Sequence, residues 1–250
     1  MTGRGSRTFY EDLTRSYATR GDEVLWQAGW VRALTADGPS SFRLLDVGCG
    51  PGHHLRQAAQ GVDATVVGVD VALTVLVEAA GHGIAAVQSE LGTQPLPFAS
   101  GSFDLVIAAQ VIEHLVDTDA LVEEIHRVLR PGGRLLLTTP NLAAWFNRGM
   151  LLLGMQPLFT EVSTSEVFGR PGRQVVGHLR LFTKPAVEEF LRARGFTDVD
   201  VVGGTYHDIP GPLRLVDRVM RRRAGFAANL LVTGIRPVDE EPWQAPSVSR

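Results

Sequence analysis

The feature that most constrains the fold of this sequence is a short apolar run that ends in a glycine-rich loop. Residues Arg43–Val47 have the length and composition of a buried strand, and the loop Gly48–Gly52 follows at once. A helical pattern then starts at His53. A strand, a glycine loop and a helix in this order open a βαβ unit, whose helix returns the chain so that the next strand is parallel to the first.

The remainder of the chain continues this alternation of apolar strand-type runs and helical patterns, so we expect an α/β fold with a mainly parallel sheet. A helix from Phe9 to about Leu34 comes first, and turn residues stand at Pro131–Gly133. The other predicted strands are Ala64–Asp70, Ile84–Val87, Phe103–Ala109, Gly133–Thr139, Val199–Tyr206 and Asn229–Ile235; the predicted helices are His53–Gln60, Leu73–Ala80, Leu115–Leu129, Pro185–Arg194 and an insert at Pro210–Arg223.

Composition excludes several classes of protein. The net charge of −3 over 250 residues offers no global attraction to a phosphate backbone, so we expect no nucleic-acid partner. The single cysteine, Cys49, allows no disulfide within the chain, which favours a cytoplasmic location. No apolar run approaches the roughly 20 residues that span a bilayer, and residues 1–10 lack the apolar region of a signal peptide, so we expect a soluble protein without stable membrane insertion.

An acidic residue complements the glycine loop. Asp70 ends the second predicted strand, 22 residues after Gly48. A carboxylate in that position can accept hydrogen bonds from both hydroxyls of a ribose, while glycines let the backbone approach a ligand closely. The two features predict a nucleoside site at the carboxyl edge of the sheet.

The spacing of the loop distinguishes between nucleosides. A dinucleotide loop reads G-x-G-x-x-G, whereas this loop reads G-x-G-x-G and resembles motif I of the class I S-adenosylmethionine-dependent methyltransferases, in their type 11-like, small-molecule branch. Three further segments resemble that family in the expected order: Pro95–Val106, Val111–Leu115 and Leu129–Leu135. The resemblance implies a Rossmann-like, doubly wound sheet of seven mostly parallel strands, with the last strand antiparallel and a helical lid inserted.

The resemblance also implies S-adenosyl-L-methionine as cofactor and assigns roles to residues. Asp46 would anchor the amino-acid end, Asp70 the ribose, and Gln110 would lie beside the methionine end. Glu90 stands where the family often has an aspartate that contacts adenine, so it either binds adenine or is solvated. The implied cofactor-binding residues are Asp46, Gly48, Gly50, Gly52, Asp70, Val71, Glu90, Leu91 and Gln110.

Catalysis needs little from the protein beyond alignment, but a hydroxyl acceptor benefits from a general base, and histidine is suited to that role near neutral pH. His114 is the first candidate because it follows the fourth strand at the ligand edge; the alternative is a capping or packing residue. His178 and His207 are second choices, and the histidine spacing has no metal signature, so we predict no metal. Cys49 has no obvious base near it.

The segment after the fifth strand carries more apolar surface than a loop usually does, including Trp145, Phe146 and Leu151–Leu153. It packs on the core, contacts a partner or encloses an apolar acceptor. Arg221–Arg223 either contacts a phosphate or anionic lipid, or is a solvated face. We divide the chain into an N-terminal helical cap (residues 1–41), the cofactor-binding core (42–141), a lid insert (142–183), a C-terminal part of the core with a helical insert (184–236) and a loose tail (237–250).

The functional hypothesis is therefore methyl transfer by in-line displacement to an oxygen or nitrogen atom of a small molecule of secondary metabolism, with lipophilic and glycan-linked acceptors both open. The alternatives are a nucleoside- or S-adenosylmethionine-binding protein without turnover, and an NAD-type oxidoreductase, which the loop spacing disfavours. The sequence is compatible with a homodimer and sets no oligomeric state.

Overall fold

The computed structural model describes residues 21–35, 42–172, 175–205 and 209–238. Within them the strands form one sheet of seven, in the order β3-β2-β1-β4-β5-β7-β6. The strand β7 runs antiparallel to both of its neighbours, and the remaining pairings are parallel. The strands are β1 (Phe42–Val47), β2 (Ala64–Asp70), β3 (Ala85–Gln88), β4 (Phe103–Ala109), β5 (Leu129–Pro140), β6 (Thr197–Gly204) and β7 (Asn229–Ile235). This is the predicted α/β architecture, including the antiparallel last strand.

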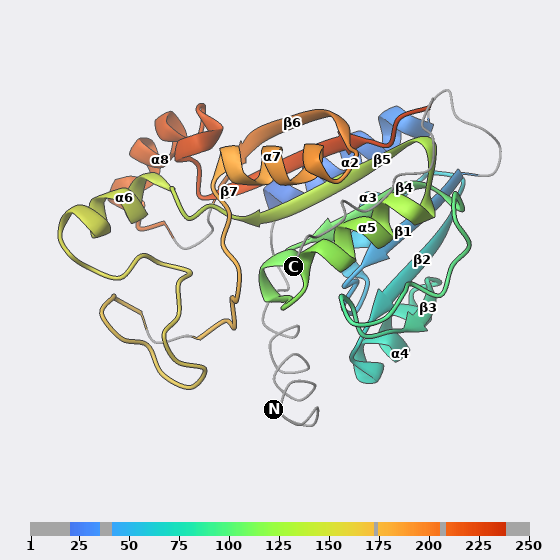
Figure 1. Cartoon of the computed structure of the whole chain (residues 1–250), viewed down its shortest axis with the longest axis horizontal. Coiled ribbons are helices and arrows are strands. Elements are labelled where there is room, and N and C mark those ends of the chain that lie inside the picture. Colours follow the sequence, from blue (N-terminus) through green and yellow to red (C-terminus); the bar gives the residue numbers. More distant parts are fainter. Residues whose placement is uncertain (1–20, 36–41, 173–174, 206–208, 239–250) are drawn as a thin grey trace, which may run out of the picture.

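Helices cover both faces of the sheet (Figure 1). They are α2 (Gly21–Thr35), α3 (His53–Ala58), α4 (Leu73–Gly81), α5 (Thr118–Val128), α6 (Trp145–Leu152), α7 (Lys184–Ala193) and α8 (Arg214–Met220), with short 3₁₀ turns η1 (Ile112–His114), η2 (Gly211–Leu213) and η3 (Ala224–Phe226).

The two sides of the sheet form two apolar clusters. Because side chains alternate along a strand, β1 supplies Leu45 and Val47 to the cluster beneath α5 and α7, and Phe42 and Leu44 to the cluster beneath α2 and α3. The sheet is thereby buried on both faces, and the carboxyl edge of its parallel strands is where ligands bind in folds of this type.

Two local predictions were wrong. Helix α5 begins at Thr118 rather than Leu115, because Asp117 caps it: the Asp117 carboxylate accepts a hydrogen bond from the Ala120 backbone N–H at 2.9 Å. The residues predicted as a turn, Pro131–Gly133, lie inside β5, where a register shift against β4 accommodates them as a bulge at the strand's exposed start.

Two inserts leave the regular fold. Helix α6 begins the segment predicted as a lid (residues 142–183, called the lid below), between β5 and α7, and α8 lies between β6 and β7; both are at the same end of the sheet (Figure 1). The predicted cap before residue 21 and the tail from residue 239 lie outside the described residues. Among the helices that the structure describes, none combines the length and apolar character that crossing a membrane requires.

Candidate functional site

The glycine loop lies at the carboxyl edge of the sheet, between β1 and α3. The backbone N–H groups of Gly48 and Cys49 both donate to the carbonyl oxygen of Val69 in β2, at 2.7 and 3.0 Å. These bonds tie the loop to the neighbouring strand, so its shape is set by the sheet rather than by a ligand.

The three predicted glycines all have left-handed backbone conformations, with φ of 72° at Gly48, 52° at Gly50 and 78° at Gly52. Side chains other than glycine rarely adopt such angles. A Cβ atom on Gly48 would also lie 2.3 Å from Cγ2 of Val111, which follows β4. A side chain larger than that of glycine would therefore not fit at Gly48.

The substitution Gly48→Ala should lower the free energy of unfolding by about 1–3 kcal/mol, because it combines left-handed strain with the contact at Val111. Thermal or urea unfolding would measure this. Val111→Ala alone would also destabilise, but the double variant should lose less than the sum of the two single changes; full additivity would contradict the proposed contact.

Two carboxylates meet beside the loop. Asp70 is buried at the end of β2, and its two oxygens accept hydrogen bonds from the backbone N–H groups of Gly50 and Ala72, both at 2.9 Å. Asp46, at the end of β1, is also buried. Burial, and secondarily the charge of Asp70, raise the pKa of Asp46 to about 8. Burial likewise raises the pKa of Asp70, against the effect of its backbone hydrogen bonds.

This arrangement favours a ligand that brings hydroxyl donors and positive charge. Two adjacent buried carboxylates repel each other, and a cationic or hydroxyl-bearing ligand would relieve that repulsion. The glycine loop brings its backbone beside these carboxylates, since the Gly50 N–H donates to Asp70. The two carboxylates therefore fit the ribose hydroxyls, the ammonium and the sulfonium of the cofactor that the sequence resemblance implies.

The other predicted cofactor residues are arranged around the same edge. Val71 is half-buried, and its carbonyl accepts a hydrogen bond from the Gln88 side chain at 2.9 Å. Leu91 packs against the core, whereas Glu90 is exposed to solvent. Gln110 has a left-handed φ of 57°, which is strained for this residue type.

Two hydrogen bonds to Thr138 in the neighbouring strand β5 hold Gln110 in this conformation. Its backbone N–H donates to the carbonyl of Thr138 in β5 at 2.9 Å, and its side-chain amide donates to the Thr138 hydroxyl at 3.1 Å. Strain of this kind is typical of functional sites, because the surrounding structure must enforce it. Thr138 was missed in the sequence analysis, since nothing in its local pattern distinguishes a buried strand threonine from a site residue.

His114 is buried at the end of η1, and the lid supplies its neighbours. Its Nδ1 lies 3.1 Å from the carbonyl oxygen of Gly177, and its ring centroid lies 4.9 Å from that of His178. Since a carbonyl oxygen only accepts, His114 Nδ1 carries the proton in this contact, and in a neutral ring with that proton Nε2 is the acceptor nitrogen. The fold thus brings together two of the three predicted histidines; His207 lies outside the described residues.

Glu113 fastens the returning lid to the site. Its carbonyl oxygen accepts hydrogen bonds from the backbone N–H groups of Leu179 and Arg180, at 2.7 and 3.0 Å. Its fully buried carboxylate accepts a hydrogen bond from the Thr139 hydroxyl at 3.2 Å. Glu113 belongs to a segment that resembles the family, Val111–Leu115, but its local pattern indicates no role for it.

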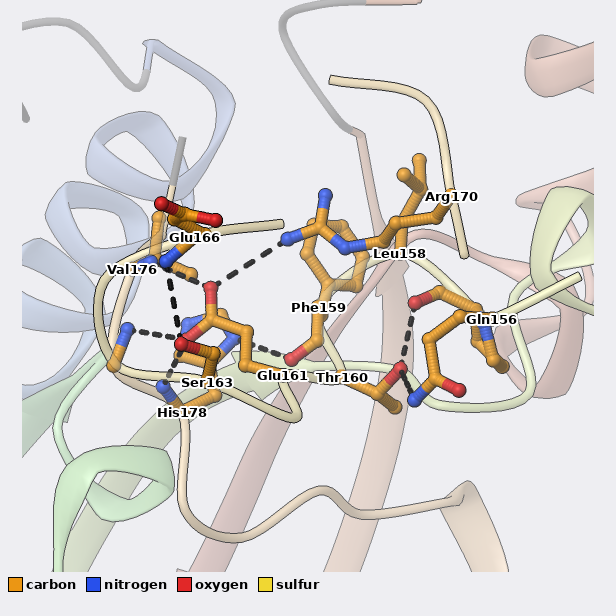
Figure 2. Close-up of polar contacts among 12 residues, drawn as sticks. Gln156, Leu158, Phe159, Thr160, Glu161, Ser163, Glu166, Arg170, Val176 and His178 are labelled. Carbon is orange, nitrogen blue, oxygen red and sulfur yellow. Dashed lines mark hydrogen bonds and ion pairs between the residues drawn. The ribbon is translucent and has the colours of Figure 1, made fainter. Parts of the chain in front are cut away.

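A second group of polar contacts, centred on Glu161, holds the lid segment together (Figure 2). The carboxylate of Glu161 accepts hydrogen bonds from the backbone N–H groups of Val176 and Gly177, both at 2.6 Å, and of His178 at 3.2 Å. Arg170 forms an ion pair with the same carboxylate at 3.5 Å. The His178 ring is further held through Nδ1, 3.0 Å from the Phe159 carbonyl oxygen. Glu161 therefore organises the segment that lies against His114.

Two groups of described side chains have ligand atoms close enough to hold a divalent cation: Glu113, His114 and His178, and His53, Glu78 and His82. In each group the candidate atoms lie within 4.8 Å of one another. Arg56 lies 3.3 Å from His82 in the second group, and its positive charge opposes a cation there. The first group is the stronger candidate, although the sequence analysis predicted no metal.

Two residues have structural roles. Cys49 is buried and donates to the Gly50 carbonyl, and burial raises the pKa of its thiol far above neutrality, which leaves it a poor nucleophile. Asp104 accepts a hydrogen bond from the Arg43 backbone N–H and pairs with Arg130 at the start of β4, away from the ligand edge.

Comparison with known proteins identifies the family. The family model of the methyltransferase domain matches residues 45–137. Over 186 residues the chain is 30% identical to a ubiquinone biosynthesis O-methyltransferase of Xanthomonas axonopodis pv. citri, a match that covers 72% of this chain and 73% of the relative. It is 34% identical to nocamycin O-methyltransferase of Saccharothrix syringae over 62% of this chain, but spans only 59% of that relative.

Solved structures agree in fold. A methyltransferase of Thermotoga maritima, described as a possible histamine N-methyltransferase, superposes with a TM-score of 0.59 at 16% identity, over 92% of this chain and 99% of its own. A phosphoethanolamine N-methyltransferase of Haemonchus contortus in complex with S-adenosyl-L-methionine gives a TM-score of 0.55 at 18% identity, over 91% of this chain and 60% of its own. The chain belongs to the class I S-adenosylmethionine-dependent methyltransferases.

Proposed function

We propose that this enzyme transfers the methyl group of S-adenosylmethionine to a small acceptor, preferentially to a hydroxyl oxygen and secondarily to nitrogen. The observation that carries the oxygen preference is the buried His114 ring, with its Nδ1 proton held by the Gly177 carbonyl. Two relatives that are O-methyltransferases by name support the same choice. Family membership sets aside the NAD-type oxidoreductase alternative.

The cofactor is held by the loop and the two carboxylates in this proposal. Asp70 accepts from the ribose hydroxyls while keeping its bonds to the loop, and Asp46 anchors the amino-acid end. The glycine loop lets the backbone approach the cofactor closely, at Gly48, Gly50 and Gly52. The rest of the cofactor is flanked by four further residues, namely Val71, Glu90, Leu91 and Gln110. When bound, the cofactor supplies a methyl group on a sulfonium, which is a good leaving group.

The chain's own contribution to the reaction is alignment and proton removal. His114 Nε2 accepts the proton of the acceptor hydroxyl as that oxygen forms a bond to the methyl carbon and the carbon–sulfur bond breaks. The lid contacts at Glu113 and Glu161 keep His178 against His114, so the base is held in one orientation. Alignment at about 3 Å is the main source of rate in such a displacement.

The lid supplies an apolar wall for the acceptor. Phe146 packs edge-on against Phe159 with centroids 5.9 Å apart, and Phe159 packs against His178 at 6.1 Å. These rings lead from the apolar segment to His178, whose ring packs against that of the proposed base, His114. We therefore place a lipophilic acceptor, or the lipophilic part of a larger one, against this wall.

A panel of phenolic, aliphatic-alcohol, glycoside and amine acceptors, assayed with methyl-labelled cofactor, tests the proposal. Transfer to hydroxyl acceptors, with phenols that carry apolar substituents preferred, is the expected result. Transfer to amines alone would contradict the oxygen preference. Cofactor binding with no transfer to any acceptor would favour a protein that keeps the fold without turnover.

We expect catalysis to need no metal, in spite of the Glu113, His114 and His178 cluster, because the proposed base must accept a proton through the nitrogen that a cation would occupy. Enzyme treated with EDTA and then desalted should keep its full rate, and added Zn²⁺ should inhibit by occupying His114. A rate that falls on chelation and returns with a divalent ion would contradict this prediction.

Cofactor affinity should rise with pH below neutrality. The pKa of Asp46 in the protein without ligand is raised to about 8, so at lower pH its carboxyl holds a proton that binding of a cationic group must displace. The linkage predicts up to about tenfold weaker binding for each pH unit between roughly 7.5 and 6. Calorimetric titration with S-adenosylhomocysteine would measure it, and Asp46→Asn should bind more weakly but with a flatter pH dependence.

A further inference from the structure

Exposed apolar side chains are concentrated on the two inserted helices. At the end of α6, Leu152 and Leu153 are 88% and 78% exposed, and on α8, Leu215 and Val219 are 67% and 52% exposed. Leu215 and Val219 are spaced by four residues, so they lie on the same outward side of the helix, whereas Asp217 between them is buried. Apolar patches of this kind usually mark a surface that contacts another body.

The two helices are linked to each other and lie at the same end of the sheet. The Trp145 indole N–H in α6 donates to the Asp217 carboxylate in α8 at 3.1 Å. The Arg148 guanidinium lies over the ring of Phe226 in η3, 4.5 Å from its centroid. Figure 1 shows α6 and α8 side by side at one end of the sheet. We call residues 148–153 and 213–223 the α6–α8 surface.

This surface is basic as well as apolar, although the whole chain has a net charge of −3. It carries six arginines, namely Arg148, Arg214, Arg218 and the run Arg221–Arg223. Residues 142–160 contain no acidic residue, and Asp217 is the single acid in residues 209–225. Because Asp217 is buried against Trp145, the charge presented outward is positive.

We propose that the α6–α8 surface docks the enzyme onto an anionic lipid bilayer. Arginine side chains pair with lipid phosphates, and leucine and valine side chains between them insert at the boundary of headgroups and acyl chains. A second copy of the chain is a poorer match, since a symmetric contact would bring identical arginines together. A nucleic acid would leave the intervening apolar side chains without a partner. Docking does not depend on which acceptor is methylated.

Vesicle flotation of the full chain tests this proposal without any acceptor. Binding should be at least about tenfold stronger to vesicles of phosphatidylcholine mixed with phosphatidylglycerol than to phosphatidylcholine alone, and should weaken at high salt. Equal binding to both kinds of vesicle, or to neither, would overturn the proposal.

Matched variants assign the binding to this surface. Leu215→Ser, and separately the pair Arg218→Gln and Arg222→Gln, should each reduce binding to the anionic vesicles several-fold. The controls are Val77→Ser on α4, where Val77 is 68% exposed against 67% for Leu215, and Arg56→Gln on α3. An equal loss in the controls, or no loss in the α8 variants, would contradict the assignment. Unchanged cofactor binding shows that each variant is folded.

Size-exclusion chromatography of the same proteins tests whether a second copy of the chain, rather than a bilayer, covers this surface. If Leu215→Ser converts a dimer to a monomer and the wild-type chain does not bind anionic vesicles, the surface is an interface between copies of the chain. The lipid proposal is then wrong.

Discussion

Replacing Asp70 with alanine should weaken S-adenosylmethionine binding by about 1–3 kcal/mol, or roughly 5- to 150-fold in Kd, the range for lost hydrogen bonds to a charged group. The variant loses the acceptor proposed for the ribose hydroxyls. It also loses the acceptor of the Gly50 and Ala72 backbone N–H groups, so the loop itself becomes less ordered. Isothermal titration with S-adenosylmethionine and S-adenosylhomocysteine would measure the change.

Asp104→Ala is the matched control for this experiment. Asp104 is also a buried carboxylate that accepts a backbone hydrogen bond, from Arg43, but it lies at the start of β4 instead of at the end of a strand. The Asp104→Ala substitution should lower the free energy of unfolding and leave the cofactor affinity of the folded protein unchanged. If Asp70→Ala bound the cofactor as tightly as the wild type, Asp70 would have no part in the site.

Replacing His114 with alanine should slow methyl transfer to a hydroxyl acceptor on the order of 10²-fold or more, while cofactor affinity stays within about twofold of the wild type. The reason is that the proposed role of His114 is proton removal from the acceptor and not contact with the nucleoside. Single-turnover rates with saturating cofactor would separate the chemical step from binding.

The control variant here is His126→Ala. His126 is buried on α5 with its ring edge against Phe196, and burial lowers its pKa to about 4, so it is neutral near pH 7 and remote from the ligand edge. The His126→Ala substitution should lower the free energy of unfolding but leave the methyl-transfer rate of the folded enzyme unchanged. A wild-type rate for His114→Ala would mean that alignment alone accounts for catalysis and that His114 is a packing residue.

Local sequence patterns predicted the core of the fold and the position of the glycine loop because both depend on interactions close in the chain. The left-handed conformations of Gly48, Gly50 and Gly52 follow from glycine chemistry. Strands β2, β4 and β7 begin and end where their apolar runs do. The predicted boundaries failed where a side chain or a partner strand intervened, as with the Asp117 cap of α5 and the bulge in β5.

The arrangement of the proposed catalytic centre depends on residues that are far apart in the sequence. His114 and Gly177 are 63 positions apart, and their contact exists because Glu113 and Glu161 tie the lid back to the sheet edge. No periodicity or spacing encodes such a contact. The strain at Gln110 is equally invisible in the sequence, since it arises from its bonds to Thr138 on a neighbouring strand.

The sequence by itself determined that this chain builds a mostly parallel α/β sheet with a glycine loop after its first strand and a carboxylate at Asp70, because strand length, helical period and glycine conformation are local properties. Only the tertiary structure decided which histidine meets His114, which carboxylate organises the segment against it, and that α6 and α8 lie side by side at one end of the sheet. Those outcomes are set by packing and hydrogen bonds between distant segments, whose partners become neighbours only when the chain is folded.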